Sequence, residues 1–234
     1  MLNQEAKIYA IPGWGFQASV FNMLNNENFH IDGLDYIHLS QLTLTEIAQN
    51  LSASLAEQSV LLGWSFGGLL AIKISALFPK KVKKLILLDS QPRLLASLNW
   101  TGIDQITSKN FEKALQQGFK KQMNWFIRLV CYPNRSPAIR QVLKQHLFQE
   151  SIQELTSLLS LLFDADLRDE YRNLDSDVLH IISEQDMVIP QNRIQLTALN
   201  PRINTRTFPG TEHAGFLTNR VAYIDAIKGF LNAN

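Results

Sequence analysis

Short apolar segments, each bounded by turn residues, recur along the chain and alternate with amphipathic stretches. The segments with the pattern of buried strands are 7–12, 36–39, 59–64, 84–89, 178–183 and 204–208. Helical patterns lie between them. One follows a capping box from Thr43 to Glu46, and another places Val221, Ile224 and Ile227 near one face. This alternation predicts an α/β protein with a mainly parallel sheet flanked by helices.

The alternation stops in the middle of the chain, where three helical patterns follow one another without a strand. The first carries an apolar stripe from Phe111 to Val130, the second begins with Ser136 as N-cap and Pro137 in its first turn, and the third turns Leu155 and its apolar neighbours inward. We therefore expect a helical lid at residues 108–163, here called the cap. It is inserted into a core formed by 1–107 and 164–234.

Composition places the chain among ordinary globular proteins. Its 234 residues, 46% hydrophobic and 18% charged, can enclose one sizeable core, and its net charge of +1 gives no reason to expect nucleic-acid binding. No apolar run approaches the roughly 20 residues that span a bilayer, and the amino terminus lacks a secretory pattern. With Cys131 as its single cysteine, the chain is expected to be cytoplasmic, not membrane-bound, with a monomer favoured.

The strongest chemical signal is a Gly-x-Ser-x-Gly turn between an apolar strand and an apolar helix. Gly63 and Gly67 stand two residues on either side of Ser65. The tight turn brings the strand and helix backbones too close for side chains at the two glycine positions. Such a turn projects the serine from the sheet edge, above the N-terminus of the following helix. Ser65 is therefore the predicted nucleophile of a hydrolase.

A nucleophilic serine needs a histidine as base and a carboxylate to orient that histidine, and this fold orders them serine, acid, histidine. Asp186, in the loop after a predicted strand, is the favoured acid, with Asp89 and Glu184 as alternatives. His213 is the one histidine that follows Asp186. The other four are interpreted as surface or packing residues. No cluster has metal-ligand spacing, so neither a metal nor a cofactor is expected.

The reaction also requires two backbone donors for the oxyanion. The residue after the nucleophile, Phe66, supplies one N–H, and a loop after an earlier strand supplies the other. The turn Gly13-Trp14-Gly15 follows the first predicted strand, which makes the Trp14 amide the expected second donor. Pro12 has no N–H and is excluded.

Together these residues resemble the α/β-hydrolase superfamily and, within it, the pimeloyl-[acyl-carrier protein] methyl ester esterases of biotin synthesis. The resemblance covers most of the chain. It rests on the segments 13–15, 63–69, 166–168 and 213–214, and on Phe119 and Phe126 in the cap. Trp64, directly before the nucleophile, is its most discriminating element. The resemblance implies an apolar substrate tunnel under the cap, lined by Trp14, Trp64, Phe66 and Phe126.

The chain also departs from the pattern of those esterases. Pro12 stands before Gly13 where a histidine is usual, and Ser183 stands where a glycine commonly starts the acid loop. The first hairpin of the fold and a glycine-rich loop after Tyr36 are missing. The chain is therefore a shortened version in which all three triad positions are filled.

The cap is strongly basic. Between positions 109 and 149 a single acid, Glu112, stands against the basic residues Lys109, Lys113, Lys120, Lys121, Arg128, Arg135, Arg140 and Lys144. Lys113, Lys121 and Arg128 fall opposite the apolar stripe, so a shared basic face is expected, which steers acidic partners. The resemblance implies that an acidic acyl carrier protein docks near Lys120, Lys121, Arg135 and Arg140. An ordinary solvated helix face is the alternative interpretation.

The leading hypothesis is a serine carboxylesterase for the methyl ester of pimeloyl-acyl carrier protein. A general hydrolase of small esters, or a lyase-like enzyme that uses the same triad, is the first alternative, because fold does not fix substrate. The second is a catalytically silent binding protein of the same fold. The three filled triad positions argue against it.

Overall fold

Parallel strands form the centre of the molecule in a computed structural model that describes residues 6–148, 151–190 and 192–233. Within these residues the sheet has six strands in the order β2-β1-β3-β4-β5-β6. The strands are β1 (Ala6–Ile11), β2 (Phe29–Gly33), β3 (Ser59–Trp64), β4 (Val82–Leu88), β5 (Asp177–Ser183) and β6 (Asn204–Phe208). All neighbouring pairs are parallel, which confirms the predicted class.

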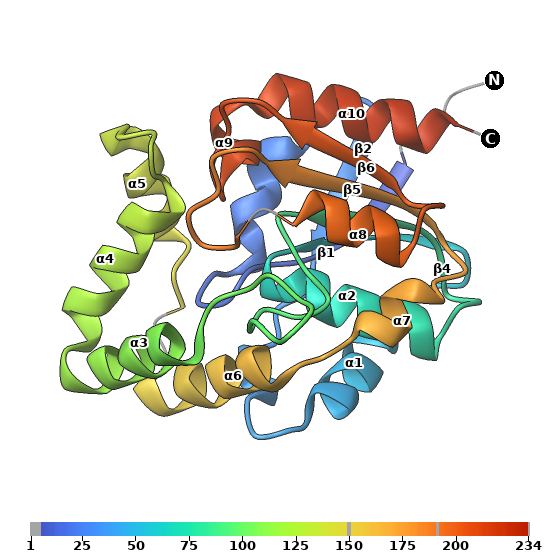
Figure 1. Cartoon of the computed structure of the whole chain (residues 1–234). Coiled ribbons are helices and arrows are strands. Elements are labelled where there is room, and N and C mark those ends of the chain that lie inside the picture. Colours follow the sequence, from blue (N-terminus) through green and yellow to red (C-terminus); the bar gives the residue numbers. More distant parts are fainter. Residues whose placement is uncertain (1–5, 149–150, 191, 234) are drawn as a thin grey trace.

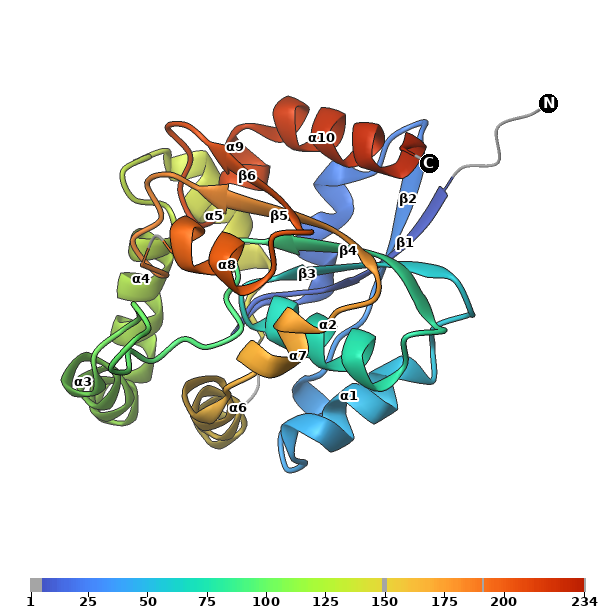
Figure 2. The ribbon, with the colours of Figure 1, turned by 45° about the vertical axis from the view of Figure 1, so that its right-hand side comes forward.

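Helices cover both faces of the sheet (Figures 1 and 2). One face carries α1 (Leu44–Ser52), α2 (Phe66–Leu77), α7 (Arg168–Arg172) and α8 (Arg193–Leu199). The other carries the 3₁₀ helix η1 (Ala18–Leu24), α9 (Gly215–Thr218) and α10 (Arg220–Asn232). Because both faces are covered, the central strands are apolar throughout. Leu85, Ile86, Leu87 and Leu88 of β4 are all fully buried.

The capping box predicted at the first helix is confirmed. The Thr43 hydroxyl accepts a hydrogen bond from the Glu46 backbone N–H at 3.3 Å, and the Glu46 carboxylate accepts one from the Thr43 N–H at 2.9 Å. These two bonds satisfy donors that the first turn of a helix otherwise leaves unpaired.

The strand predicted at residues 36–39 is wrong. That segment forms a short 3₁₀ helix, η2 (Ile37–Leu39), and the edge strand β2 lies earlier, at Phe29–Gly33. In β2 only Phe29 and Ile31 are buried, while His30 points to solvent. An edge strand that exposes one face to solvent alternates apolar and polar residues. Over only five residues this alternation gives a weak signal.

The first helix predicted for the cap is two helices. Gly118 separates α3 (Gln105–Gln117) from α4 (Phe119–Val130), because glycine is a poor helix former. The cap continues with α5 (Pro137–Gln145), capped by Ser136 as predicted, and α6 (Ile152–Asp164). Residues 149 and 150 of the cap lie outside the described residues. Lys113 is therefore on a different helix from Lys121 and Arg128, so the three do not lie on the face of one helix as predicted.

The parallel topology gathers the candidate site at one end of the sheet. Ser65 follows β3, Asp186 lies in the loop after β5, and His213 lies in the loop after β6. The carboxyl ends of parallel strands share one edge, where open α/β sheets bind their ligands. The cap helices α3 to α6 lie at this same edge (Figure 1).

Candidate active site

Ser65 occupies a strained turn between β3 and α2. Its backbone has φ 53° and ψ −119°, a region that side-chain-bearing residues rarely adopt. Its N–H donates to the Leu88 carbonyl at 2.9 Å. A Cβ at Gly63 would lie 2.5 Å from the Gly67 carbonyl oxygen, and one at Gly67 would overlap the Ile11 carbonyl. The turn therefore requires both glycines, as the sequence pattern indicates.

His213 and Asp186 form a buried pair. The Nδ1 atom of His213 lies 2.7 Å from one carboxylate oxygen of Asp186, and both side chains are almost fully buried. The other oxygen of Asp186 accepts hydrogen bonds from the backbone N–H groups of Val188 and Ile189, at 2.7 and 2.9 Å. Three contacts thus fix the orientation of the Asp186 carboxylate, which in turn fixes the imidazole ring.

The two alternative acids lie elsewhere. Asp89 is buried and directs both carboxylate oxygens to Ser183, one to its backbone N–H at 2.6 Å and the other to its hydroxyl at 2.9 Å. Burial, reinforced by the negative charge of Asp186, raises the pKa of the Asp89 carboxyl well above its usual range. Glu184 is exposed. Of the three candidates, the structure brings Asp186 to His213.

The turn expected to supply an oxyanion donor passes beside the nucleophile. A Cβ at Gly13 would lie 3.3 Å from the Cβ of Ser65, and Gly15 adopts φ 82°, which favours glycine. Trp14 is the residue between them. Phe66 begins α2, and its backbone N–H therefore has no acceptor within the helix. Both amides named from the sequence thus belong to backbone that adjoins Ser65.

A cavity of about 410 Å³ opens onto Ser65 and Asp186. Trp14 forms part of its wall, and its indole N–H donates to the Leu155 carbonyl of α6 at 2.8 Å. Phe126 packs edge-on against the Trp14 ring, with 5.3 Å between centroids. The remaining wall is mainly apolar and comes from the loop before α3, from α3, α4 and α6, and from the acid loop. The structure thus brings Trp14 and Phe126 together, as expected.

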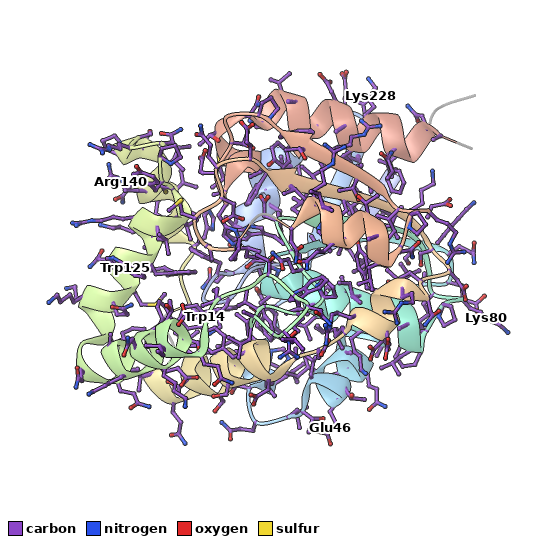
Figure 3. The ribbon with its side chains drawn as sticks, viewed as in Figure 1. Trp14, Glu46, Lys80, Trp125, Arg140 and Lys228 are labelled. Atoms are coloured by element: carbon purple, nitrogen blue, oxygen red, sulfur yellow. The ribbon has the colours of Figure 1, made fainter. Side chains whose placement is uncertain are left out.

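Among the wall residues that sequence reasoning did not name are Trp125 and Met187. Trp125 of α4 and Met187, directly after Asp186, both line the cavity and are about half exposed. Figure 3 shows Trp125 on α4 and Trp14 between the cap helices and the sheet. For Met187 a signal was available, because an apolar side chain directly after the favoured acid is placed to reach the substrate. Trp125 had no such signal, since it lies off the apolar stripe of its helix.

The structure contradicts the expectation that Trp64 and Phe66 line the substrate tunnel. Trp64 is fully buried away from the cavity, and its indole N–H donates to the His213 carbonyl at 2.8 Å. Its ring packs against the imidazole and against Phe216, at centroid distances of 5.4 and 5.0 Å. Phe66 is also fully buried and packs edge-on against Tyr36. Trp64 therefore supports the backbone of His213.

A second polar network lies behind the nucleophile. His180 is fully buried, with Nδ1 3.0 Å from the Tyr171 hydroxyl and Nε2 2.9 Å from the Ser90 carbonyl. The Ser90 hydroxyl donates to the Ser65 carbonyl at 2.9 Å. Burial lowers the pKa of His180 to about 4, so the ring is neutral at pH 7. The network braces the turn that carries Ser65.

The basic residues named on the cap differ in exposure. Lys120 and Lys121 on α4 are exposed, as is Arg135 in the loop before α5. Arg140 on α5 is half-buried: its guanidinium donates to the Arg135 carbonyl, and its Nε atom is buried with no hydrogen-bond partner among the described residues. Three of the four side chains therefore face solvent freely.

Over residues 6–148, 151–190 and 192–233, no group of three or more His, Cys, Asp or Glu side chains is placed to hold a metal ion. Nor does any described helix combine the length and apolarity required to cross a membrane.

A family model described as the alpha/beta hydrolase fold matches residues 41–220. The chain belongs to this family. Two curated relatives are both named pimeloyl-[acyl-carrier protein] methyl ester esterase. The protein from Yersinia enterocolitica is 26% identical over 97% of this chain and 93% of its own length, and that from Vibrio vulnificus is 28% identical over 97% and 94%.

Solved structures agree with this fold. An esterase from Exiguobacterium antarcticum superimposes with a TM-score of 0.84 at 18% identity, over 99% of this chain and 94% of that chain. A bromoperoxidase from Bacillus anthracis gives 0.86 at 14% identity, over 99% and 93%. The family, with relatives named esterases, supports the prediction that this hydrolase-fold chain is a carboxylic ester hydrolase.

The Trp64→Phe variant tests the support of His213. It removes the indole N–H and leaves the buried His213 carbonyl without that donor, so stability falls by about 1–3 kcal/mol. We expect kcat for an ester to fall about tenfold as well, because the loop that carries His213 loses an anchor. Trp100→Phe is the matched control, since it loses a similar 2.8 Å bond from its indole to the Arg93 carbonyl. Equal kcat losses in both variants would contradict the assignment.

The buried His180 predicts a pH-dependent stability. With its pKa lowered to about 4 in the folded chain, unfolding takes up a proton between about pH 6.5 and 4, so the free energy of unfolding falls as pH falls through this window. In urea denaturation, the free energy of unfolding of wild type should fall by on the order of 3 kcal/mol more than that of His180→Gln across this pH window. The exposed His38→Gln is the matched control. Parallel curves for wild type and His180→Gln would refute the prediction.

Proposed function

We propose that the chain is a serine carboxylesterase that hydrolyses the methyl ester of pimeloyl-acyl carrier protein. The proposal rests on the buried pair of His213 and Asp186, 2.7 Å apart, at the edge where Ser65 opens onto an apolar cavity. Relatives named for this reaction match nearly the whole chain and support the choice of substrate.

In the proposed mechanism Ser65 attacks the ester carbonyl while His213 accepts its proton. Asp186 holds the imidazole in the required orientation and stabilises its charged form. The backbone N–H groups of Trp14 and Phe66 stabilise the negative charge that develops on the carbonyl oxygen. Methanol leaves with the proton from His213. Water, activated by the same histidine, then hydrolyses the acyl-enzyme and releases the free carboxylate.

The cavity suits an acyl chain that carries an ester at one end and a carrier at the other. Trp14, Phe111 and Phe126 give its wall an apolar surface, which favours a polymethylene chain. With the methyl ester at Ser65, the chain extends past Trp125 and Met187, whose partial exposure marks the open side of the cavity. The thioester to the carrier then lies outside.

The cap supplies the surface for the acidic carrier protein. Lys120, Lys121 and Arg135 are exposed on or beside α4 and α5, and Arg140 contributes through its contact with Arg135. Exposed ion pairs are individually weak, but together they raise the encounter rate with a partner of opposite charge. In this proposal residues 108–163 act as a lid on the core formed by 1–107 and 164–234, and the enzyme works in the cytoplasm.

Growth without biotin tests both the nucleophile and the substrate. The wild-type gene should restore growth to a bacterial strain that lacks its methyl esterase, and Ser65→Ala should not. Purified wild type should give a burst with a short p-nitrophenyl ester that Ser65→Ala lacks. Turnover by Ser65→Ala would disprove the nucleophile. Failure of a soluble, esterase-active wild type to restore growth would instead favour a general hydrolase of small esters.

Charge reversal on the cap tests carrier docking. The double variant Lys120→Glu with Lys121→Glu should lower kcat/KM for the carrier-bound methyl ester about tenfold at low salt, while p-nitrophenyl ester hydrolysis is unchanged. Lys80→Glu with Lys228→Glu is the matched control. Both lysines are exposed and lie away from α4 and α5 (Figure 3). Equal losses in the two double variants would show that net charge, not the cap, is responsible.

A further inference from the structure

Asp89 is a buried polar residue with an unusual backbone conformation that the proposed mechanism leaves unused. It directly follows β4 with φ 43°, a left-handed conformation that aspartate tolerates better than most residues. Its side chain is 3% exposed, and its N–H donates to the Ile181 carbonyl of β5 at 3.0 Å. A strained, buried carboxyl group at the edge of the candidate site indicates a specific task.

Both oxygens of this carboxyl group contact one residue. Ser183, the last residue of β5, approaches them with its backbone N–H at 2.6 Å and its hydroxyl at 2.9 Å. The same hydroxyl lies 2.9 Å from the Tyr223 hydroxyl of α10. Asp186 follows three residues later, and its N–H donates to the Ser183 carbonyl at 3.3 Å. Asp89 therefore holds the first residue of the segment that carries the proposed acid.

The groups around Asp89 favour the neutral form of its carboxyl group. The titratable groups that act on it or on its partners are Asp186 in the acid loop, Glu212 in the histidine loop and Tyr223 on α10. Burial and the neighbouring Asp186 raise the pKa of Asp89 well above its usual range. Its two oxygens accept hydrogen bonds from the Ser183 N–H and from the Ser183 hydroxyl. An asparagine side chain can bond to the same two groups, with its oxygen accepting from the N–H and its NH₂ donating to the hydroxyl.

We propose that Asp89 is a positioning residue of the triad, which fixes the start of the acid loop through Ser183 and so holds Asp186 against His213. This inference rests on the triad of the proposed function. It gives the unusual serine at position 183 a role, because a glycine there would keep the backbone bond and lose the bond from the hydroxyl.

A comparable contact between the same strands serves as a control. The Ser176 hydroxyl, directly before β5, donates to the Val82 carbonyl of β4 at 2.7 Å. It joins the two strands at the opposite end of the sheet from Asp186. A purely structural role for Asp89 predicts that loss of either contact lowers stability alike and leaves turnover alone.

The test compares kcat, KM and pH profiles for a p-nitrophenyl ester. Asp89→Gly keeps the left-handed backbone and removes the carboxyl, and its kcat should fall about 10- to 100-fold with KM unchanged, because a small displacement of a catalytic group has a large effect on rate. Asp89→Asn should keep kcat within about threefold and leave the pH profile in place, as expected if the two bonds to Ser183 persist. Ser176→Ala should match wild type.

Each result decides the proposal. Wild-type kcat in Asp89→Gly would overturn it. A fall in kcat of about 10⁴-fold in Asp89→Asn would also overturn it. A fall of that size is expected for Asp186→Asn and would mean that Asp89 itself is the acid of the triad. If Asp89→Gly does not fold, Ser183→Ala replaces it: a kcat drop of about threefold to tenfold supports positioning, and no drop refutes it. Failure of the proposed function has a different signature: Ser65→Ala would then still hydrolyse the ester, whatever the Asp89 variants do.

Discussion

The close approach of three backbone segments at Ser65 is the constraint on which the site depends. The end of β3, the start of α2 and the end of β1 approach so closely that Gly63 and Gly67 have no room for a Cβ. This packing holds Ser65 in a conformation that an unconstrained serine would leave. It also brings the Gly13-Trp14-Gly15 turn against the serine. One packing requirement thus positions both the nucleophile and the turn with the second expected oxyanion donor.

The other residues of the site reach the same place through the parallel sheet. Because β3, β4, β5 and β6 run in one direction, the loops after them meet at one edge. Fully buried groups then fix each loop: Trp64 binds the carbonyl of His213, and the Ser90 hydroxyl binds the carbonyl of Ser65. The cavity wall comes largely from the cap, whose Phe126 packs on Trp14. Core elements therefore align the reacting groups, and the cap shapes the space that substrate occupies.

Local signals predicted the parts of the structure that depend on nearby residues. The glycines around Ser65 and the Thr43–Glu46 capping box each describe a few consecutive positions, and the structure forms both turns as expected. Long-range packing was harder to foresee. The edge strand β2 has one wet face and too little apolar signal, a single Gly118 divides a continuous stripe into two helices, and the direction of the Trp64 side chain depends on a histidine loop about 150 residues away.

The choice between Asp89 and Asp186 shows where sequence reasoning reaches its limit. Each aspartate follows one of two adjacent parallel strands, so strand order and loop position fit both. Their surroundings differ: Asp186 receives two backbone N–H groups and an imidazole, whereas Asp89 meets Ser183 in a fully buried turn. Two buried carboxylates so near each other are not both charged at low free energy. The same proximity raises the pKa of Asp89, whereas Asp186 is the carboxyl group that contacts the imidazole and so can stabilise its protonated form.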